Sequence, residues 1–354
     1  MSRFRIPESR ALRLALALFF VGLVVLLVWW RGPNLGTIAG AFQEVRWEWV
    51  VVAIALNLLS VVVRALAWRT VIGQAMPPPH PKPLLVFSAF SVGLFANAVL
   101  PGRIGELARV AVLTRKLPRR RGIWATLVGT VFAHRLFDLV PVVLLILYVF
   151  ATAGIPGWAI GTLLVVVGGG LALAGFAFVS ARRHHTAMPE AFGRVRGLLT
   201  MARQGLAVMR TPLGAAVAVF FQICGWVCQL LAVYTAMRAF DIHSPLPAAG
   251  VVLLLMNVVT IFPFWPGNIG LVQVAIASAL VGYGVAYARG VAYGFGLQAI
   301  EASVGIGVGL IFLAREGLSF AMLKGMPTAD RAQMDGGDAE PEAEAEPEPE
   351  RIRR

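Results

Sequence analysis

Long runs of apolar residues alternate with short, mostly basic loops along most of this chain. A helix needs about 20 predominantly apolar residues to cross the hydrocarbon core of a bilayer. Six runs approach or exceed that length, and we predict a membrane-spanning helix for each: 14–30, 49–68, 123–150, 158–179, 213–237 and 292–314. The predicted fold class is therefore all-α, a polytopic helical membrane protein with about six spanning helices.

Two further apolar stretches, 84–114 and 246–285, are each interrupted by the same pattern, Pro-Gly-x-Ile-Gly. One copy of the pattern begins at position 101 and the other at position 266. Proline ends a helix and glycine lets backbones approach closely, so each stretch is predicted to form a hairpin of two short helices. The predicted hairpin tips are Pro101, Gly102, Gly105, Pro266, Gly267 and Gly270.

The charges beside these stretches predict how the hairpins enter the membrane. Basic residues flank the first hairpin on both sides, with Arg69 and Lys82 before it and Arg115, Lys116 and 119–121 after it. By the positive-inside rule both of its ends are cytoplasmic. Its longer arm is about 24 Å at 1.5 Å per residue, so neither arm has to cross. The second hairpin has few flanking charges and is predicted to enter from outside.

Interrupted segments at corresponding places in two halves of a membrane protein are the best sequence indication of a transport site. We therefore predict an inverted repeat with two re-entrant broken-helix hairpins. The membrane domain covers 1–326, with halves at about 14–150 and 158–315. Both termini are predicted to be cytoplasmic, in a cell membrane of the bacterial inner-membrane type.

The two ends of the chain need separate interpretation. Four arginines precede the run 14–30, which resembles a signal peptide with a small-residue site at 39–41. Its length and its final two tryptophans favour an uncleaved first span instead. Residues 327–354 are rich in Pro, Glu and Ala without apolar periodicity, and are predicted to be a disordered, acidic, cytoplasmic tail.

Composition supports a membrane protein, because 58% of the 354 residues are hydrophobic and only 14% are charged. Soluble domains carry about 25% charged residues. Four of the 31 bases and nine of the 18 acids lie in 327–354, which leaves 27 bases against nine acids before it. These bases lie in short loops, so membrane orientation and anionic lipids explain them better than nucleic acid. The expected partners are membrane lipids, and the oligomeric state is not indicated.

The helix after the first break carries three charged residues on one face, Arg103, Glu106 and Arg109. Ionisable residues at membrane depth are functional candidates by default. The start of a helix favours anions, and the planar fork of Arg103 suits a phosphate group. Together with Asn97 and Asn268, which lie beside the two breaks, these are the predicted substrate-binding residues. The alternatives are a structural ion pair for the charges and capping of freed backbone groups for the asparagines.

Five further polar residues at membrane depth are predicted to form a surrounding charge network: His134, Arg135, Asp138, Glu301 and Arg64. Removing one partner from such a buried set leaves an uncompensated charge, so a pair that locks two spans together is the alternative to substrate contact for His134, Arg135 and Asp138. Arg64 lies late in its span and has the alternative of extending to the inner surface. Glu301 is the only acid deep in the last span, where it acts as a proton relay or pairs with Arg135 or Arg289.

Enzymatic motifs are absent from the sequence. There is no phosphate-binding loop of the Walker type, no His-Glu-x-x-His and no metal-spaced cluster. Cys224 and Cys228, the only two cysteines, lie one turn apart in an apolar span and suit packing better than metal binding or redox chemistry. We therefore expect no enzyme, no metal and no cofactor.

Two motifs resemble those of a known family. Asn97-Ala-Val-Leu-Pro-Gly-Arg-Ile-Gly-Glu-Leu-Ala-Arg109 is similar to the Asn-x-x-Pro-x-Arg-x-Gly-Glu-x-x-Arg signature of the lysylphosphatidylglycerol synthase transmembrane-region, or flippase-like, family. Pro263-Phe-Trp-Pro-Gly-Asn-Ile-Gly270 resembles its second motif, and Arg64-Ala-Leu-Ala-Trp68-Arg69 its early Arg/Trp segment. The resemblance covers about 14–315.

This resemblance implies movement of lipids, including aminoacylated phosphatidylglycerol, between leaflets. The chain departs from the family in two places: it has His134-Arg135 where members often have Glu-Arg, and Gln273 near the position of a common glutamate. The second departure argues against binding of a cationic group there. The soluble aminoacyl-transferase domain of the full synthase is missing from this sequence, so lipid aminoacylation is not expected.

Together these observations predict a translocator for an anionic phospholipid or a lipid-linked phosphate head group. The alternative is a non-catalytic accessory subunit of an envelope lipid or glycosyltransferase system, docked to an envelope-synthesis protein through the acidic tail and the basic segment 181–211. A third interpretation is an ion or small-solute carrier, in which proton-dependent uptake depends on Glu301 or Glu106.

Overall fold

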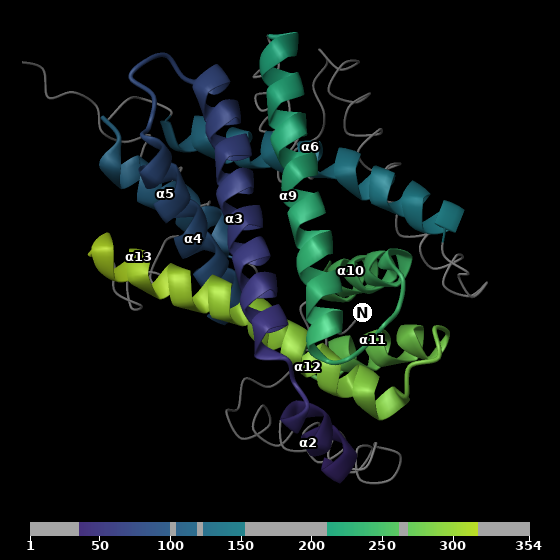
Figure 1. Ribbon diagram of the computed structural model, residues 1–354. Coiled ribbons are helices and arrows are strands. Elements are labelled where there is room, and N and C mark those ends of the chain that lie inside the picture. The colour runs from purple at the N-terminus through teal and green to yellow at the C-terminus, as the bar shows by residue number, and fades with distance from the viewer. Residues whose placement is uncertain (1–34, 100–103, 119–122, 153–210, 262–267, 318–354) are drawn as a thin grey trace, which may run out of the picture.

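The computed structural model describes residues 35–99, 104–118, 123–152, 211–261 and 268–317. The secondary structure of this part of the chain is helical (Figure 1). The helices in chain order are α2 (Leu35–Gln43), α3 (Trp47–Ala75), α4 (Pro83–Val99), α5 (Gly105–Lys116), α6 (Ile123–Thr152), α9 (Pro212–Ala239), α10 (Leu246–Ile261), α11 (Leu271–Val281), α12 (Tyr287–Ala302), the π-helical segment η3 (Ser303–Val308) and α13 (Gly309–Arg315).

Among the described residues, four helices are long and apolar enough to cross a membrane: α3, α6, α9 and the continuous helix Tyr287–Arg315. A helix of 28 to 30 residues is about 42–45 Å long, more than the roughly 30 Å of the hydrocarbon core. They coincide with four of the six predicted spans, which confirms a polytopic, multi-pass helical membrane protein. The other two predicted spans, 14–30 and 158–179, and the predicted tail lie outside the described residues.

The two interrupted stretches form the expected pairs of short helices. In each pair, α4 with α5 and α10 with α11, the two helices pack against each other. None exceeds 17 residues, or about 26 Å. The predicted tip residues Pro101, Gly102, Pro266 and Gly267 lie outside the described residues. That the hairpins enter the membrane without crossing it stays a prediction.

The order and length of the helices repeat at the offset that separates the two Pro-Gly motifs, which is 165 residues (266 minus 101). We call this the repeat offset. Shifting α3 by this offset gives 212–240, shifting α5 gives 270–281 and shifting α6 gives 288–317, which are within two residues of α9, α11 and the helix Tyr287–Arg315. The shifted α4 covers 248–264 and overlaps α10. The spacing first seen between the two motifs is therefore also the spacing between two sets of four described helices.

The two halves meet along α3 and α9, which lie side by side in opposite directions (Figure 1). At one end the Arg46 N–H donates a 3.0 Å hydrogen bond to the Ala239 carbonyl, and at the other Gln74 packs against Gly214. At the centre, the Ser60 hydroxyl donates a 2.8 Å bond to the Gly225 carbonyl. Ser60 and Gly225 are themselves separated by the repeat offset, so the pseudo-twofold axis of the inverted repeat passes close to them.

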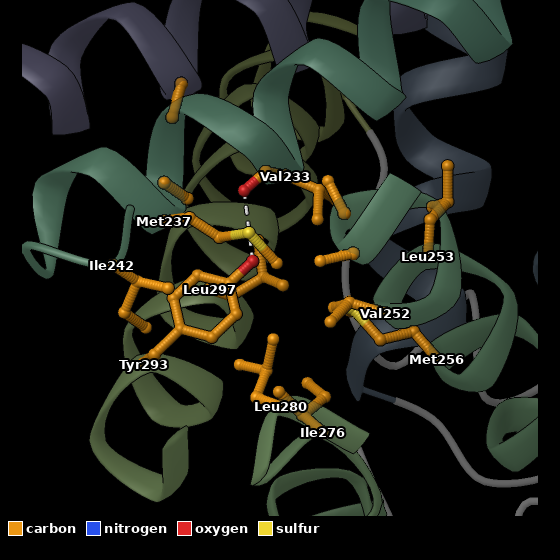
Figure 2. Close-up of a cluster of buried hydrophobic side chains, with 14 of the residues drawn as sticks. Val233, Met237, Ile242, Val252, Leu253, Met256, Ile276, Leu280, Tyr293 and Leu297 are labelled. Carbon is orange, nitrogen blue, oxygen red and sulfur yellow. Dashed lines mark hydrogen bonds between the residues drawn. The ribbon is translucent and has the colours of Figure 1, made fainter. Parts of the chain in front are cut away.

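An apolar core joins the second hairpin to α9 and α12 (Figure 2). Tyr293 and Leu297 of α12 lie against Met237, Ile242 and Leu280, and all five are at least 98% buried. The Tyr293 hydroxyl donates a 3.0 Å hydrogen bond to the Val233 carbonyl, which satisfies the only polar atom of this side chain. A second apolar cluster, which includes Trp68, Phe90 and Leu113, joins the first hairpin to α3 and α6.

Candidate functional site

The charged residues of the first hairpin form ion pairs inside the helical bundle. Arg109, on α5, is 3% exposed, and its Nη2 lies 2.5 Å from Glu106 Oε2. Its guanidinium carbon lies 4.6 Å from the centre of the Trp68 ring and 5.4 Å from that of Phe90. Two aromatic rings and one carboxylate therefore surround Arg109, although its Nε has no hydrogen-bond partner among the described residues. This environment fixes the guanidinium in place.

Arg135 of α6 continues the chain of charges. It contacts Glu106 Oε1 through Nη2 and Asp138 Oδ2 through Nη1, the latter at 3.3 Å. Asp138 also accepts a 3.1 Å hydrogen bond from Trp226 Nε1 of α9. The side chain of Arg135 is 53% exposed, whereas those of Arg109 and Asp138 are 4% and 11% exposed. Arg135 is thus the most accessible member of this set.

Arg64 lies close to the pseudo-twofold axis. Its Nη2 donates a 2.6 Å hydrogen bond to Gln229 Oε1, and its guanidinium lies 5.1 Å from the Trp226 ring. Its aliphatic part packs against Gly225, where a Cβ would approach Arg64 Cγ to 2.8 Å. Arg64 therefore points into the interface between the halves and not toward the inner surface. Gln229 is the counterpart of Arg64 at the repeat offset.

Glu301 joins this set from the second half. Its Oε1 accepts a 3.4 Å hydrogen bond from Gln229 Nε2, so one amide group separates Glu301 from Arg64. The expected pairing with Arg135 or Arg289 is not what the structure shows. Arg135 contacts Glu106 and Asp138, and Arg289 contacts Glu44 and Asp241. The π-helical segment η3 begins two residues after Glu301, and π segments are frequent at functional sites.

His134 has a structural position beside this network. Its Nε2 lies 3.2 Å from the Arg64 carbonyl oxygen and 3.3 Å from Gln222 Nε2. Gln222 Nε2 also donates a 3.2 Å hydrogen bond to the His134 carbonyl. His134 is 2% exposed and Gln222 is fully buried. These contacts connect α3, α6 and α9 where they cross.

Amide side chains satisfy backbone groups beside both helix breaks. Asn97 Oδ1 accepts a 2.8 Å hydrogen bond from the Gly105 N–H, and Gln273 Oε1 accepts one of 2.6 Å from the Gly270 N–H. Asn268 Nδ2 donates a 2.8 Å bond to the Val259 carbonyl. This is the geometry of the capping alternative. A substrate contact by Asn97 or Asn268 stays a prediction.

The structure thus brings most of the predicted site residues into one set of contacts. Glu106, Arg109, Arg135 and Asp138 are ion-paired, and Arg64 and Glu301 are connected to them through uncharged side chains. Arg103 lies outside the described residues, so its predicted phosphate contact is untested. Sequence reasoning missed the connecting residues Gln222, Trp226 and Gln229, and it named Trp68 only as part of the early Arg/Trp segment. The signal available for the first three was a polar or aromatic side chain within an apolar span.

Chemically, the network contains three guanidinium groups and three carboxylates, and they lie among the apolar helices of the bundle. It reaches from the first hairpin through α6, α3 and α9 to the last helix, and so includes both halves. Charges in such a setting are costly to bury and persist where they bind a polar group that crosses the membrane or hold helices together. Among the described residues there is no group of three or more acids, cysteines or histidines suited to a metal ion.

Comparison with known proteins agrees with this architecture. The family model described as the lysylphosphatidylglycerol synthase TM region matches residues 11–309. A UPF0104 membrane protein from Methanothermobacter thermautotrophicus is 24% identical over 282 residues, which cover 74% of this chain and 81% of the relative. A UPF0104 membrane protein from Pyrococcus horikoshii is 28% identical over 134 residues, 38% of each chain. No solved structure matches.

Proposed function

The chain belongs to the lysylphosphatidylglycerol synthase transmembrane-region family, and from this membership and the buried ion network we propose that it moves the phosphate-bearing head group of a lipid between leaflets. The cargo is an anionic phospholipid or a lipid-linked phosphate. The protein lies in a cell membrane with both termini in the cytoplasm, so the first hairpin approaches the network from inside.

The observation that carries this proposal is the unequal exposure of the guanidinium groups. Arg109 is enclosed by Trp68, Phe90 and Glu106, and Arg64 lies in the interface between the halves. Arg135 is half-exposed, yet two carboxylates hold it in one orientation. A planar guanidinium that is both oriented and accessible suits an incoming phosphate group, whose oxygens match its paired N–H donors.

The network also provides a means of accepting and releasing the anion. A phosphate at Arg135 competes with Glu106 and Asp138 for the same N–H groups. Because Glu106 is also ion-paired with Arg109, and Asp138 also accepts a hydrogen bond from Trp226, each carboxylate keeps one partner when Arg135 turns to the phosphate. Binding that is favourable but easily reversed is what transport requires.

Leaflet exchange in proteoliposomes tests this function. Phosphatidylglycerol with a fluorescent acyl chain is bleached from outside by dithionite, and bleaching beyond the outer leaflet reports exchange. We expect Arg135→Gln to slow exchange at least about tenfold, since hydrogen bonds to charged groups contribute about 1.5–3 kcal/mol. Arg135→Lys should be intermediate, because lysine keeps the charge and loses the planar fork.

Arg315→Gln is the matched control, because Arg315 is an exposed arginine at the end of α13, outside the network. Exchange that is equally slow in Arg135→Gln and Arg315→Gln would remove the assigned role of Arg135. If no lipid tested exchanges with the wild-type protein, translocation itself is refuted. Co-purification with an envelope-synthesis enzyme would then support the accessory role.

A further inference from the structure

Four charged residues connect the two halves at the end of the molecule that carries α2. Arg46 Nη2 lies 3.0 Å from Asp241 Oδ1, and Arg289 lies 3.4 Å from Glu44 Oε2 and 3.8 Å from Asp241 Oδ2. Glu44 and Arg46 lie between α2 and α3, Asp241 follows α9, and Arg289 is in the first turn of α12. We refer to these four residues as the α2-end cluster.

The α2-end cluster has no copy at the other end of the repeat. The counterparts of Arg46, Asp241 and Arg289 at the repeat offset are Thr211, Met76 and Trp124, which cannot form ion pairs. The opposite end has a different connection between the halves. Lys116, the last residue of α5, lies 3.2 Å from Glu316, which follows α13 and also accepts a 2.7 Å hydrogen bond from Ser88. We call Lys116 and Glu316 the α5-end pair.

A pocket of about 640 Å³ lies at the α2-end cluster. Glu44, Asp241 and Arg289 line it together with Ile242 and Tyr283. A cavity of this size is within the range of small-molecule sites. Its lining thus combines ion-paired residues with Ile242, which also belongs to the apolar core.

The last long helix connects this cavity to the polar network. Arg289, Tyr293, Leu297 and Glu301 follow one another at intervals of four positions, so each lies about one turn after the one before and about 40° further around the axis. Arg289 belongs to the α2-end cluster and Glu301 to the network, about 18 Å further along the axis. Between them Tyr293 and Leu297 are packed in the apolar core, as Figure 2 shows. Buried side chains of the apolar core therefore lie between Arg289 and Glu301 along this helix.

On the basis of the proposed lipid translocation, we propose that the α2-end cluster is a gate: its ion pairs hold this end of the two halves together, and they open to admit a head group from the cavity to the network. The α5-end pair closes the opposite end in the same way. The members of the α2-end cluster are between 38% and 67% exposed in their side chains. Solvated ion pairs of this kind are weak enough to break and reform during a conformational cycle.

The distance between the halves at this end tests the gate directly. Spin labels are placed at Gln43→Cys on α2 and Ala286→Cys before α12, both exposed, in a background that lacks the only two native cysteines (Cys224→Ser and Cys228→Ser). Pulsed electron paramagnetic resonance in nanodiscs then gives the distribution of distances. Arg46→Gln, Asp241→Asn and Arg289→Gln should each increase the population with longer distances, by up to about fivefold.

The controls separate a gate from a general loosening. Arg46→Lys should keep the background distribution because it keeps the charge. Adding Arg46→Gln to Asp241→Asn should open the gate no further than Asp241→Asn alone, because Asp241 is the only acid that Arg46 pairs with among the described residues. Glu316→Gln breaks the α5-end pair and should not lengthen the α2-end distances. Unchanged distributions in Arg46→Gln and Arg289→Gln, or equal lengthening by Glu316→Gln, would overturn the proposal. A shifted distribution without lipid exchange in the wild type would instead refute translocation alone.

Discussion

The two hairpins share a backbone design and differ in chemistry. Gly105 begins α5 and its counterpart Gly270 precedes α11, each with its N–H bound by an amide side chain. Where the first hairpin has Glu106 and Arg109, however, the second has Leu271 and Val274 at the equivalent positions of the repeat. Arg109 is 3% exposed, whereas Leu271 and Val274 are 37% and 49% exposed. The repeat thus supplies a symmetric scaffold, and the buried charge is confined to one hairpin.

The same divergence is found at the pseudo-twofold axis. Residues close to such an axis face their own counterparts, so a faithful copy would place two arginines against each other at positions 64 and 229. Like charges at close range are unfavourable. The structure has Gln229 there, and its amide accepts a hydrogen bond from Arg64 while donating one to Glu301. Electrostatic repulsion therefore requires different residues at positions 64 and 229, whatever their role in function.

The largest expected difference between the hairpins is the loss of stability when Arg109 of the first hairpin, or its apolar counterpart Val274 of the second, is replaced by alanine. Arg109→Ala should lower the free energy of unfolding by about 3–5 kcal/mol, because it breaks a buried ion pair and empties the space between Trp68 and Phe90. Val274→Ala, the counterpart substitution, should cost less than about 1 kcal/mol because Val274 is half-exposed. Unfolding in mixed micelles with increasing SDS measures both. Equal costs would contradict the confinement of buried charge to the first hairpin.

A smaller difference is expected for the two glycines, which are needed for different reasons. A Cβ on Gly105 would overlap the Gly93 carbonyl oxygen of α4, so Gly105→Ala should cost about 2–3 kcal/mol through overpacking. Gly270 has open space around it but a φ of +94°, so Gly270→Ala should cost about 1–2 kcal/mol through backbone strain. The same unfolding assay applies, and Gly93→Ala should resemble Gly105→Ala. A reversed order would show that packing of α4 on α5 is loose.

The smallest effect, and one that the hairpins should share, comes from their amide caps. Asn97→Ala frees the N–H of Gly105, and Gln273→Ala frees that of Gly270. Each should cost about 1–2 kcal/mol, since an unsatisfied backbone donor at this depth has no water to bind. Asn97→Asp, which keeps an acceptor oxygen, is the control. A cost near zero for either alanine variant would mean that the cap is replaced by another group.

The sequence by itself determined the fold class, the four described spanning helices and the two short-helix hairpins. The reason is physical: apolar runs of sufficient length cross a membrane as helices, and proline with glycine interrupts them at defined places. The spacing between the two Pro-Gly motifs already contained the inverted repeat. Glu106, Arg109, Arg135 and Asp138 could be selected because charge is rare in such segments.

Only the tertiary structure decided which of these charges contact one another. Arg64 and Glu301 are far apart in the chain, and Gln229 joins them because α3, α9 and the last helix cross at one level. Hydropathy does not predict such crossings, because positions that face lipid and positions that face another helix are both apolar in a span. The α2 helix and the α2-end cluster were missed for a related reason. Their contacts join loops and the first turn of α12 from both halves, and no local pattern in the chain encodes that proximity.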